Sequence, residues 1–547
     1  MPADFSFQLW PDDLERLEPY IEEACARVPL LGTAGITRVV NGPIPYTPDG
    51  NPLVGPMPGV PGAYEACVFS FGITQAGGAG KVLAEWVTEG ETEWDMWSVD
   101  PRRFTSFADQ AYTNAKGVEV YSHEYDIQFP RYEWPAGRGK RVSPLYERLA
   151  SRGAQFTAHA GWERAAWFAR PGDDTSLDAC KTFDRRGPWY EAVREECLAV
   201  RDAAGLLELP GFSRFRLAGD GAAAALRALV TGTLPRTGRM SLVYISDTQG
   251  RIVSELSAVR LGKDEFLLTS GSGAEWHDEE LLRAHLAKVA ADSGGGGGGD
   301  GGGGIALTNE TEGYTALVLS GPRSADIMAE VSPAADLALP WLSHQRTTVA
   351  GCDVAALRVS YAGELGWELH VRMGDAAAVH DAVTAAGARH GLRPFGTYAL
   401  DSLRIEKGYR SWKQDLSTDY TMLEGGLARF VKLDKAQPFP GREALRRQRD
   451  AGGPAQTFAT LTVRSPDCDA PYLATVWAGD ERVGLVTSGN YGHRTEQSIA
   501  LAVVDAASAA EGTALEVEIF GERFPAVVQA EGPLYDNDNR KLRGVDS

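Results

Sequence analysis

A tyrosine and a glutamate in the second half of the sequence have the residue types and spacing needed to bind a flat, nitrogen-rich ring. Tyr361 and Glu368 stand seven positions apart, across a glycine-rich turn that leads into a predicted strand. A carboxylate at Glu368 can accept two hydrogen bonds from an aminopyrimidine edge, and Tyr361 can offer its ring face or its hydroxyl. The same spacing fits a hairpin that carries a surface acid, and spacing alone favours that alternative.

Another acid, Glu255, follows a Thr-Gln-Gly turn at the entry to a predicted strand. A carboxylate in such a place could stabilise a cationic group or position a proton during a transfer reaction. The alternative, an acid exposed on the outer face of a strand, stays open.

Near the N-terminus, Thr47-Pro48-Asp49-Gly50 begins a segment that continues through glycine and proline to Gly55. Pro-Asp-Gly is a turn signature, and a glycine-rich backbone allows a flat ring to approach closely. A hairpin turn without any ligand explains the same residues.

A second glycine-rich segment begins at Gly72 and continues through Gly77 and Gly78 into a predicted helix. The free amides at a helix N-terminus could face the negative edge of a reduced flavin ring. The alternative is a helix that happens to begin on glycines.

A flavin site of the dinucleotide-binding kind opens with a strand, a Gly-x-Gly-x-x-Gly turn and a helix that holds the pyrophosphate. Residues 1–41 contain no such motif. We therefore expect the flavin site to be incomplete in this chain, or to be completed by another polypeptide.

Composition limits the possible functions. A length of 547 residues predicts three or four domains, and a net charge of −20 argues against nucleic acid as a partner. No apolar run is long enough for a membrane span. The cysteines and histidines are not spaced as metal ligands, so we expect no metal site. Without a secretory signal at the N-terminus, we expect a cytoplasmic protein with reduced thiols.

Periodicity predicts alternating helices and strands, which indicates an α+β fold. Helices are predicted over 13–28, 76–89, 101–116, 190–204, 221–231 and 277–291, and strands over 36–41, 64–70, 214–217, 240–245, 252–261 and 265–269. Residues 125–146 are dense in proline and glycine and should be irregular, and the run at 294–304 should be a flexible loop. From Phe458 onward, short strands with turn signals predict a β-rich terminal domain.

Taken together, these motifs resemble the C-terminal two-thirds of the dimethylglycine and sarcosine dehydrogenase/oxidase family, which joins a flavin amine-oxidase domain to a body similar to the glycine-cleavage T-protein. The resemblance covers essentially the whole chain. It implies a multi-domain α+β protein: a partial FAD-dependent domain (1–117), a small central domain (118–170), a T-protein-like folate-binding domain (171–447) and a C-terminal β-barrel (448–547). The last two form a three-lobed body.

The resemblance also implies roles for the candidate residues. The run Arg358 to Glu368 is similar to the T-protein segment in which Tyr361 and Glu368 occupy folate-contacting positions. Glu255 stands where the T-protein has an aspartate near the transferred one-carbon unit, so we predict it as the catalytic residue. Thr47, Pro48, Asp49, Gly50, Gly72, Gly77 and Gly78 look like the last flavin-contacting elements.

Residues 399–427 match a T-protein segment without gaps, but two residues in or next to this stretch depart from the T-protein pattern. Leu400 stands in place of a folate-contacting arginine, and Arg429, just beyond, in place of a tryptophan, so contacts to the ligand must differ in detail. Arg404 and Glu406 are interpreted as structural partners on a helix. The segment 484–493 is expected to form a tight, polar loop, with His493 more plausible as a structural residue than as a general base.

The resemblance implies an FAD- and tetrahydrofolate-dependent demethylation of an N-methyl amine, with this chain passing the one-carbon unit to tetrahydrofolate to give 5,10-methylenetetrahydrofolate. The oxidation needs the flavin half that we expect to be missing, so a flavin-domain partner chain is one possibility. Two alternatives remain: a folate-only aminomethyl- or methyltransferase with a vestigial flavin segment, and a non-catalytic partner of a flavoprotein.

Overall fold

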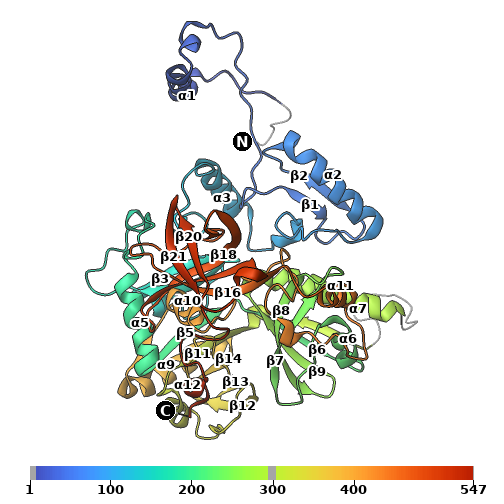
Figure 1. Ribbon diagram of the computed structural model, residues 1–547, viewed down its shortest axis with the longest axis vertical. Coiled ribbons are helices and arrows are strands. Elements are labelled where there is room, and N and C mark those ends of the chain that lie inside the picture. Colours follow the sequence, from blue (N-terminus) through green and yellow to red (C-terminus); the bar gives the residue numbers. More distant parts are fainter. Residues whose placement is uncertain (1–7, 293–303, 546–547) are drawn as a thin grey trace. The chain divides into compact units, whose positions relative to one another are not determined.

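The computed structural model describes residues 8–292 and 304–545. Figure 1 traces them through two compact units, residues 1–125 and 126–547. The loop predicted at 294–304 lies outside the described residues except for Gly304. Among the residues described, no helix is long and apolar enough to cross a membrane.

The first unit consists of helices and one antiparallel pair of strands. Its elements are α1 (Leu14–Arg27), β1 (Leu53–Pro56), β2 (Tyr64–Cys67), α2 (Gly72–Glu89) and α3 (Gln110–Ser122). The helices predicted at 13–28 and 76–89 and the strand predicted at 64–70 are confirmed.

Two predictions in this unit are wrong. Residues 36–40 belong to no helix or strand, and Asn41 forms only an isolated bridge with Trp10. An extended segment becomes a strand only when another strand takes its hydrogen bonds. The helix predicted near 101–116 begins later, because Asp109 caps α3 through the amide of Tyr112.

In the second unit, a five-stranded antiparallel sheet is covered by helices on one face. Its strands, in spatial order, are β10 (Ala306–Asn309), β6 (Ser213–Ala218), β9 (Glu265–Ser270), β8 (Ile252–Gly262) and β7 (Met240–Ser246). Helices α6 (Ala222–Leu229) and α7 (Glu275–Asp292) bury Leu226 and Leu282 against Phe215 and Leu256 of the sheet. The helices and strands predicted over 214–291 are confirmed.

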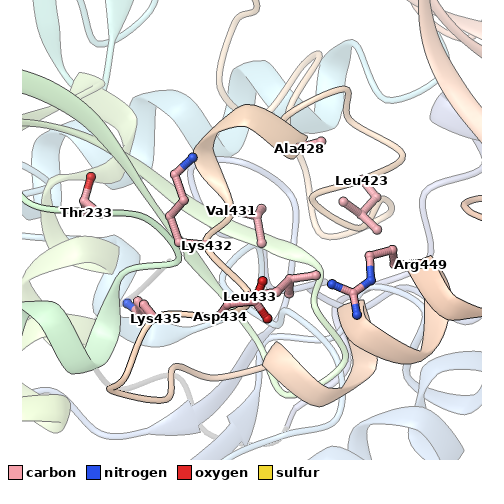
Figure 2. A pocket seen from close by; sticks show the side chains of 9 residues that line it. All are labelled: Thr233, Leu423, Ala428, Val431, Lys432, Leu433, Asp434, Lys435 and Arg449. Carbon is pink, nitrogen blue, oxygen red and sulfur yellow. The ribbon is translucent and has the colours of Figure 1, made fainter.

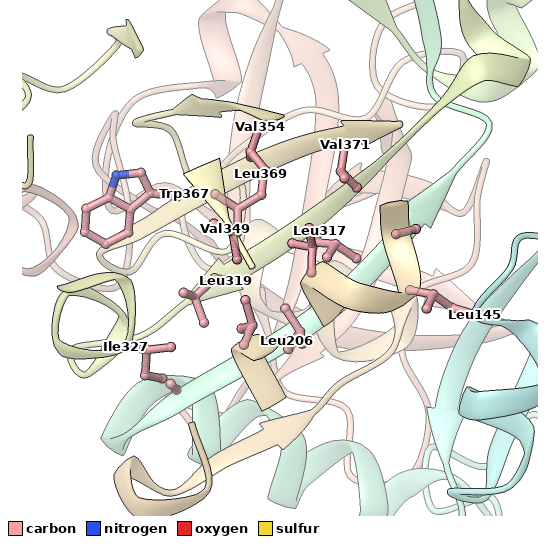
Figure 3. Packing of buried hydrophobic residues seen from close by; sticks show 14 of the residues in the cluster. Leu145, Leu206, Leu317, Leu319, Ile327, Val349, Val354, Trp367, Leu369 and Val371 are labelled. Carbon is pink, nitrogen blue, oxygen red and sulfur yellow. The ribbon is translucent and has the colours of Figure 1, made fainter. Parts of the chain in front are cut away.

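The second unit also contains a six-stranded sheet. Its strands, in spatial order, are β12 (His344–Val349), β13 (Cys352–Leu357), β14 (Gly366–Arg372), β11 (Tyr314–Ser320), β5 (Ala204–Pro210) and β15 (Leu392–Pro394). Helices α8 (Ser324–Val331) and α9 (Ala376–Gly387) pack on one face, where Ile327 and Val379 meet Leu317, Trp367 and Leu369 (Figure 3).

The opposite face of the six-stranded sheet meets α5 (Tyr190–Asp202) and α10 (Thr397–Ile405), whose Val193 and Leu403 pack with Leu207 and Val318. The hairpin β3 (Ala154–His159) and β4 (Trp162–Phe168) and the short helix α4 (Tyr146–Ala150) precede this layer. Residues 126–143 contain no regular element longer than a bridge, as the proline and glycine content predicts.

The C-terminal strands close into a barrel in the order β16 (Gln456–Val463), β19 (Gln497–Asp505), β18 (Glu481–Gly492), β17 (Thr475–Ala478), β20 (Ala514–Ile519) and β21 (Glu522–Val528). Alternate residues such as Leu461, Val476 and Val517 fill its interior. Helix α11 (Arg442–Asp450) precedes the barrel and α12 (Arg540–Arg543) follows it.

The tight loop expected at 484–493 is wrong, since most of it is strand β18. Its glycines serve close packing: a Cβ at Gly484 would collide with the backbone of Val503, and one at Gly489 with the backbone of Ala470. The multi-domain α+β fold with a terminal barrel is confirmed. The domain boundaries at 117, 170 and 447 stay predictions.

Candidate functional site

Glu255 lies on β8, on the face that does not pack against α6 and α7. Leu256 and Ala258 point into the helix-covered core, so strand alternation directs Glu255 to the other side. Its register partner across the sheet is Tyr244 on β7, whose phenol interacts with the Glu255 carboxylate.

The Glu255 carboxyl has an environment suited to holding a proton. Burial raises its pKa, and the Tyr244 hydrogen bond and the Arg410 guanidinium oppose that effect only in part. A carboxyl with a raised pKa keeps its proton to higher pH than an exposed carboxyl does, and a group that gives and takes a proton is what general acid–base catalysis requires.

Arg410 contributes an unsatisfied polar atom beside Glu255. Its Nε is buried and has no hydrogen-bond partner in the described part of the chain. Its Nη2 lies 3.5 Å from the Gly426 carbonyl, and its guanidinium lies over the Phe458 ring, 3.9 Å from the centroid. A buried donor without a partner is costly, so this atom fits an acceptor on a bound polar ligand.

Tyr361 reaches the same region from the turn before β14. Its hydroxyl donates to the Arg410 carbonyl over 3.0 Å, and its ring stacks on Tyr409 with centroids 5.9 Å apart. Burial raises its pKa, and Glu255 is among the acids that raise it further. The charge of Glu255 therefore affects the ionisation of Tyr361. The hydroxyl of Tyr361 already donates its hydrogen bond within the protein, to the Arg410 carbonyl.

Glu368 lies on β14, on the face opposite the core around Trp367 and Leu369. It is half-buried, and its Oε2 lies 3.4 Å from Nε2 of His370, two residues along the same face. Its register partners are Leu357 on β13 and Val318 on β11.

The face of the five-stranded sheet that carries Glu255 packs against the face of the six-stranded sheet that carries Glu368. Met240 and Val259 of the five-stranded sheet pack directly against Ala355 and Leu357 of the six-stranded sheet. Met240 and Val259 are register partners on the face that carries Glu255, and Leu357 shares its face with Glu368. Glu255 and Glu368 thus lie on strand faces that meet each other, and Tyr361 lies on the turn before β14.

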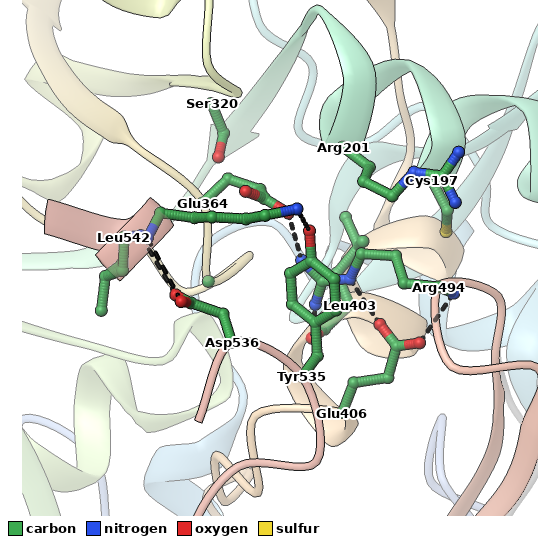
Figure 4. Close-up of polar contacts among 12 residues, drawn as sticks. Cys197, Arg201, Ser320, Glu364, Leu403, Glu406, Arg494, Tyr535, Asp536 and Leu542 are labelled. Carbon is green, nitrogen blue, oxygen red and sulfur yellow. Dashed lines mark hydrogen bonds and ion pairs between the residues drawn. The ribbon is translucent and has the colours of Figure 1, made fainter. Parts of the chain in front are cut away.

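The turn that carries Tyr361 is held by a buried ion network (Figure 4). Glu364, three residues after Tyr361, accepts from Nη1 of Arg494 over 2.9 Å, and Glu406 accepts from Nε of Arg494 over 2.5 Å. The Tyr535 phenol interacts with the Glu364 carboxylate. The Arg494 guanidinium lies over the Tyr535 ring, with its carbon 4.0 Å from the ring centroid. The barrel, α10 and the C-terminal segment therefore fix the turn jointly.

Arg404 and Glu406 are structural, as predicted, but they are not partners of each other. Arg404 pairs with Asp401 at 2.7 Å and Asp415 at 2.9 Å, whereas Glu406 pairs with Arg494. His493 is buried against the rings of Tyr190 and Tyr491. Burial lowers its pKa to about 3, which leaves it uncharged and a poor base at neutral pH.

A cavity of about 560 Å³ lies beside this region (Figure 2). Its lining comprises Thr233, Leu423, Ala428, Val431, Lys432, Leu433, Asp434, Lys435 and Arg449. None of the three predicted residues lines it. It adjoins the site through residues 428–430, because Phe430 packs on Tyr244 with ring centroids 4.9 Å apart.

In the first unit, the polar atoms of the Thr47–Gly50 turn are used within the turn. The Thr47 hydroxyl lies 2.9 Å from Asp49 Oδ1 and 2.7 Å from the Asn51 carbonyl, and Arg103 Nε donates to Asp49 Oδ2 over 2.8 Å. Pro48 is buried, and Gly50 has φ +78°, which only glycine adopts without strain. These contacts leave little for a flavin except the backbone.

Gly72, Gly77 and Gly78 lie exposed along the first turns of α2. A Cβ added at Gly77 or Gly78 would meet no atom within 4 Å, and Ile73 beside them is 97% exposed. The helix therefore presents an open, apolar surface with room for a ring or another chain, which fits close approach of a flavin better than the Thr47–Gly50 turn does.

Sequence reasoning missed Tyr244 and Arg410. The turn at Asp247–Gly250 implies a hairpin, but counting outward from it on both sides places Tyr244 opposite Val253. A bulge between Ile245 and Ser246 shifts the register and brings Tyr244 opposite Glu255, and no sequence signal marks that bulge. Arg410 has no local signal either, because its neighbours come from β8 and the barrel.

Four family models match successive parts of the chain. The model for the FAD dependent oxidoreductase matches residues 3–86, and the one for the FAD dependent oxidoreductase central domain matches 89–143. The GCVT N-terminal domain model matches 145–435, more than half of the chain. The model for the glycine cleavage T-protein C-terminal barrel domain matches 457–536.

Two curated relatives illustrate these matches. The chain is 35% identical to the mitochondrial dimethylglycine dehydrogenase of Homo sapiens, over 97% of this chain and 60% of that protein. It is 31% identical to an aminomethyltransferase of Saccharopolyspora erythraea, over 71% of this chain and 97% of that protein. The chain spans about three fifths of the length of the first curated relatives it matches.

Among solved structures, glycine cleavage system aminomethyltransferase T from Bartonella henselae superposes with a TM-score of 0.61. The identity is 22%, and the match covers 73% of this chain and 98% of that one. At this identity the likeness shows that the two proteins share a fold.

Proposed function

The chain belongs to the family of the dimethylglycine and sarcosine dehydrogenases, with a T-protein-like body, and on that basis we propose that it transfers a one-carbon unit to tetrahydrofolate. The unit would come from an N-methyl amine that is demethylated oxidatively, and the product would be 5,10-methylenetetrahydrofolate. The observation that supports the proposal is that Glu255 and Glu368 lie on the facing sides of two packed sheets, with Tyr361 on the turn before β14.

The residues present fit a reduced pteridine. The unpaired Nε of Arg410 offers a donor, the Glu368 carboxylate offers acceptor oxygens, and the stacked rings of Tyr361 and Tyr409 offer an aromatic surface. We assign Glu368 and Tyr361 to holding the ring and Arg410 to a polar contact at its edge.

Glu255 would act on the proton balance of the transfer. When an iminium carbon bonds to both folate nitrogens, the amine leaves and the two nitrogens together lose two protons. As the bond between carbon and the amine nitrogen breaks, its electron pair returns to that nitrogen, which takes one of the two protons; the other proton is released and carries the positive charge that the iminium brought. A buried carboxyl beside Tyr244 and Arg410 can accept and return a proton at that point.

The first unit would supply part of a flavin site. FAD, when bound, provides the hydride acceptor for oxidising the amine. Gly72, Gly77 and Gly78 would allow the ring to approach α2, while Thr47, Pro48, Asp49 and Gly50 would shape the neighbouring backbone. The remainder of such a site would come from a flavin-domain partner. A cytoplasmic location stays a prediction.

A second candidate is folate-dependent aminomethyl transfer without oxidation. The match to an aminomethyltransferase over 97% of that protein's length favours it. Both candidates use the same folate site, so they differ only in whether the first unit binds a flavin.

Calorimetric titration of the purified chain with tetrahydrofolate tests the shared part of the proposal. We expect the parent to bind, and Glu368→Gln to bind at least tenfold more weakly, since one hydrogen bond to a charged group contributes about 1.5–3 kcal/mol. Glu163→Gln, which changes a buried carboxylate paired with Arg138, would be a matched control with unchanged affinity. No binding by the parent would overturn the proposal.

Glu255→Gln separates binding from chemistry. We expect it to retain tetrahydrofolate affinity while lowering the transfer rate from formaldehyde or an iminium donor by about 10²–10⁴-fold. An unchanged rate would remove Glu255 from the mechanism. The visible absorbance of the chain after incubation with FAD, alone and with a flavin-domain partner, distinguishes the two candidates.

A further inference from the structure

Arg214 connects the two sheets that carry the candidate site. It lies on β6, in register with Thr269, which is in register with Ser257 on β8. Ser257 lies two residues beyond Glu255 on the same strand face. Arg214 is 8% exposed, so its guanidinium is directed into the interior toward the six-stranded sheet.

The guanidinium makes three contacts, two of them with the six-stranded sheet. Its Nη1 lies 3.1 Å from Nδ1 of His370 on β14, its Nε donates to Glu310 Oε2 over 3.0 Å, and it lies over the Tyr314 ring, 4.1 Å from the centroid. Glu310 neutralises the arginine, and Tyr314 holds it flat. The contact with His370 joins residues that are 156 positions apart in the chain.

This contact determines which nitrogen of His370 carries the proton. A guanidinium has five donors and no acceptor, so Nδ1 of His370 must present its lone pair and the proton must lie on Nε2. Nε2 lies 3.4 Å from Glu368 Oε2, and the Nε2–H group therefore donates to that oxygen. Fixing one ring nitrogen through the other is a common way to orient a functional partner.

The hydrogen bond leaves Glu368 with one oxygen engaged and one available. Within the part of the chain that the structure describes, no residue donates to Oε1 of Glu368. Glu368 lies on the strand face that it shares with Leu357, and Leu357 packs against the other sheet.

We propose that Arg214 is a positioning residue for the folate site: by holding His370 as its Nε2–H tautomer, it sets the orientation in which Glu368 presents its free oxygen to the pteridine. This inference rests on the proposed function and deepens it. Arg214 itself contacts neither the ligand nor the reacting atoms. It acts through His370 and fixes the spacing between the two sheets.

The groups around His370 keep the imidazole neutral. Burial lowers its pKa, the Arg214 charge lowers it further, and Glu368 opposes both. His344 and Arg346 on β12 face the same cluster and interact with Arg214, and Glu310 pairs with it. Protonation of His370 would place a hydrogen on Nδ1 against the guanidinium, so the arrangement is stable only while the ring is uncharged.

The test compares Arg214→Met with Arg216→Met by anaerobic titration with tetrahydrofolate monoglutamate across about pH 6–8, the range in which histidine ordinarily titrates. Arg216 lies two residues along β6 and pairs with Glu265 at the surface, so it is a matched control. We expect Arg214→Met to bind about tenfold more weakly and to acquire a pH dependence that the parent lacks, because its His370 is free to protonate. Arg216→Met should match the parent in both.

A second pair of variants keeps the test decisive if Arg214→Met does not fold. His370→Gln retains a side-chain donor toward Glu368 and should bind within about threefold of the parent, whereas His370→Leu should lose about tenfold. Equal affinities for Arg214→Met and the parent, or for His370→Leu and His370→Gln, would overturn the inference. If the parent does not bind tetrahydrofolate, the proposed function itself fails, and the two failures are therefore distinguishable.

Discussion

The two units use glycines and apolar side chains in opposite ways. In the first unit, a Cβ at Gly77, Gly78 or Gly80 would meet open space, and the 18-residue helix α2 buries only Val82. In the second, α10 has half that length and buries six residues, and a Cβ at Gly396 would collide with the backbone of Ala166. Helix α2 of the first unit is therefore largely uncovered, whereas α10 of the second unit is packed along most of its length.

The contrast teaches that secondary structure and burial are separable. The residues of α2 form a helix through local hydrogen bonds and a glycine cap at Gly90, but most helical stability in proteins comes from packing of an apolar face. An uncovered face that includes Phe71 and Ile73 is typical of a surface that another polypeptide covers. The four predictions that follow test this difference.

Limited trypsinolysis of the full chain should show the largest effect. Cleavage after Arg16, Arg27 and Arg38, which lie in exposed segments of the first unit, should precede cleavage in the second unit by at least about a hundredfold in rate, since proteolysis follows local opening. Time-resolved mass spectrometry identifies the fragments. Early cleavage in the sheets or the barrel would show that the two units do not differ in this way.

Paired apolar truncations measure the packing directly. Leu317→Ala removes a fully buried side chain from the six-stranded sheet and should lower the free energy of unfolding by about 2–5 kcal/mol. Ile73→Ala, at a 97% exposed position, should change it by less than about 0.5 kcal/mol. Urea unfolding monitored by tryptophan fluorescence gives both values, and similar losses would contradict the contrast.

Loss of a buried ion pair in the second unit should cost more stability than loss of an exposed pair in the first. Arg494→Met leaves Glu364 and Glu406 buried without their cation and should lower stability by about 3 kcal/mol. Lys81→Met, which removes an exposed pair with Glu85 on α2, should leave the unfolding midpoint unchanged. If Arg494→Met unfolds at the parent's midpoint, the network in Figure 4 does not hold the Tyr361 turn.

The smallest effect concerns Glu255 and pH. Burial raises its folded-state pKa, so the folded protein binds this proton more tightly than the unfolded chain does, and stability is lost as pH rises from the unfolded pKa through the folded one. Glu255→Gln should therefore raise the melting temperature at neutral pH, and the gain should shrink on acidification toward pH ~4.5, near the ordinary glutamate pKa. A gain that is independent of pH would show that the carboxyl does not titrate in this way.

Local patterns predicted much of the second unit. Alternation identified β6 to β9, and the periodic helices α5 to α7 fell where expected, because each pattern reports which face of an element is buried. The same reasoning failed at 36–41 and at 484–493. Whether an extended segment finds a partner, and whether glycines turn the chain or let two strands approach, depends on what lies opposite.

For the candidate site, the sequence supplied the side chains but not their grouping. Tyr361 and Glu368 lie on one turn and strand, so their proximity is local. Three features required the two sheets and the barrel to assemble: the strand faces of Glu255 and Glu368 meet, the Nε of Arg410 is buried without a partner in the described residues, and Arg494 binds Glu364 on the turn.

The sequence by itself determined the residue chemistry, the strand and helix faces, and the family resemblance, because these depend on residue type and short-range spacing. Only the tertiary structure decided that Arg214 meets His370 and that the strand faces of Glu255 and Glu368 lie against each other, since contacts between distant segments follow from how whole faces pack and leave no periodic trace along the chain.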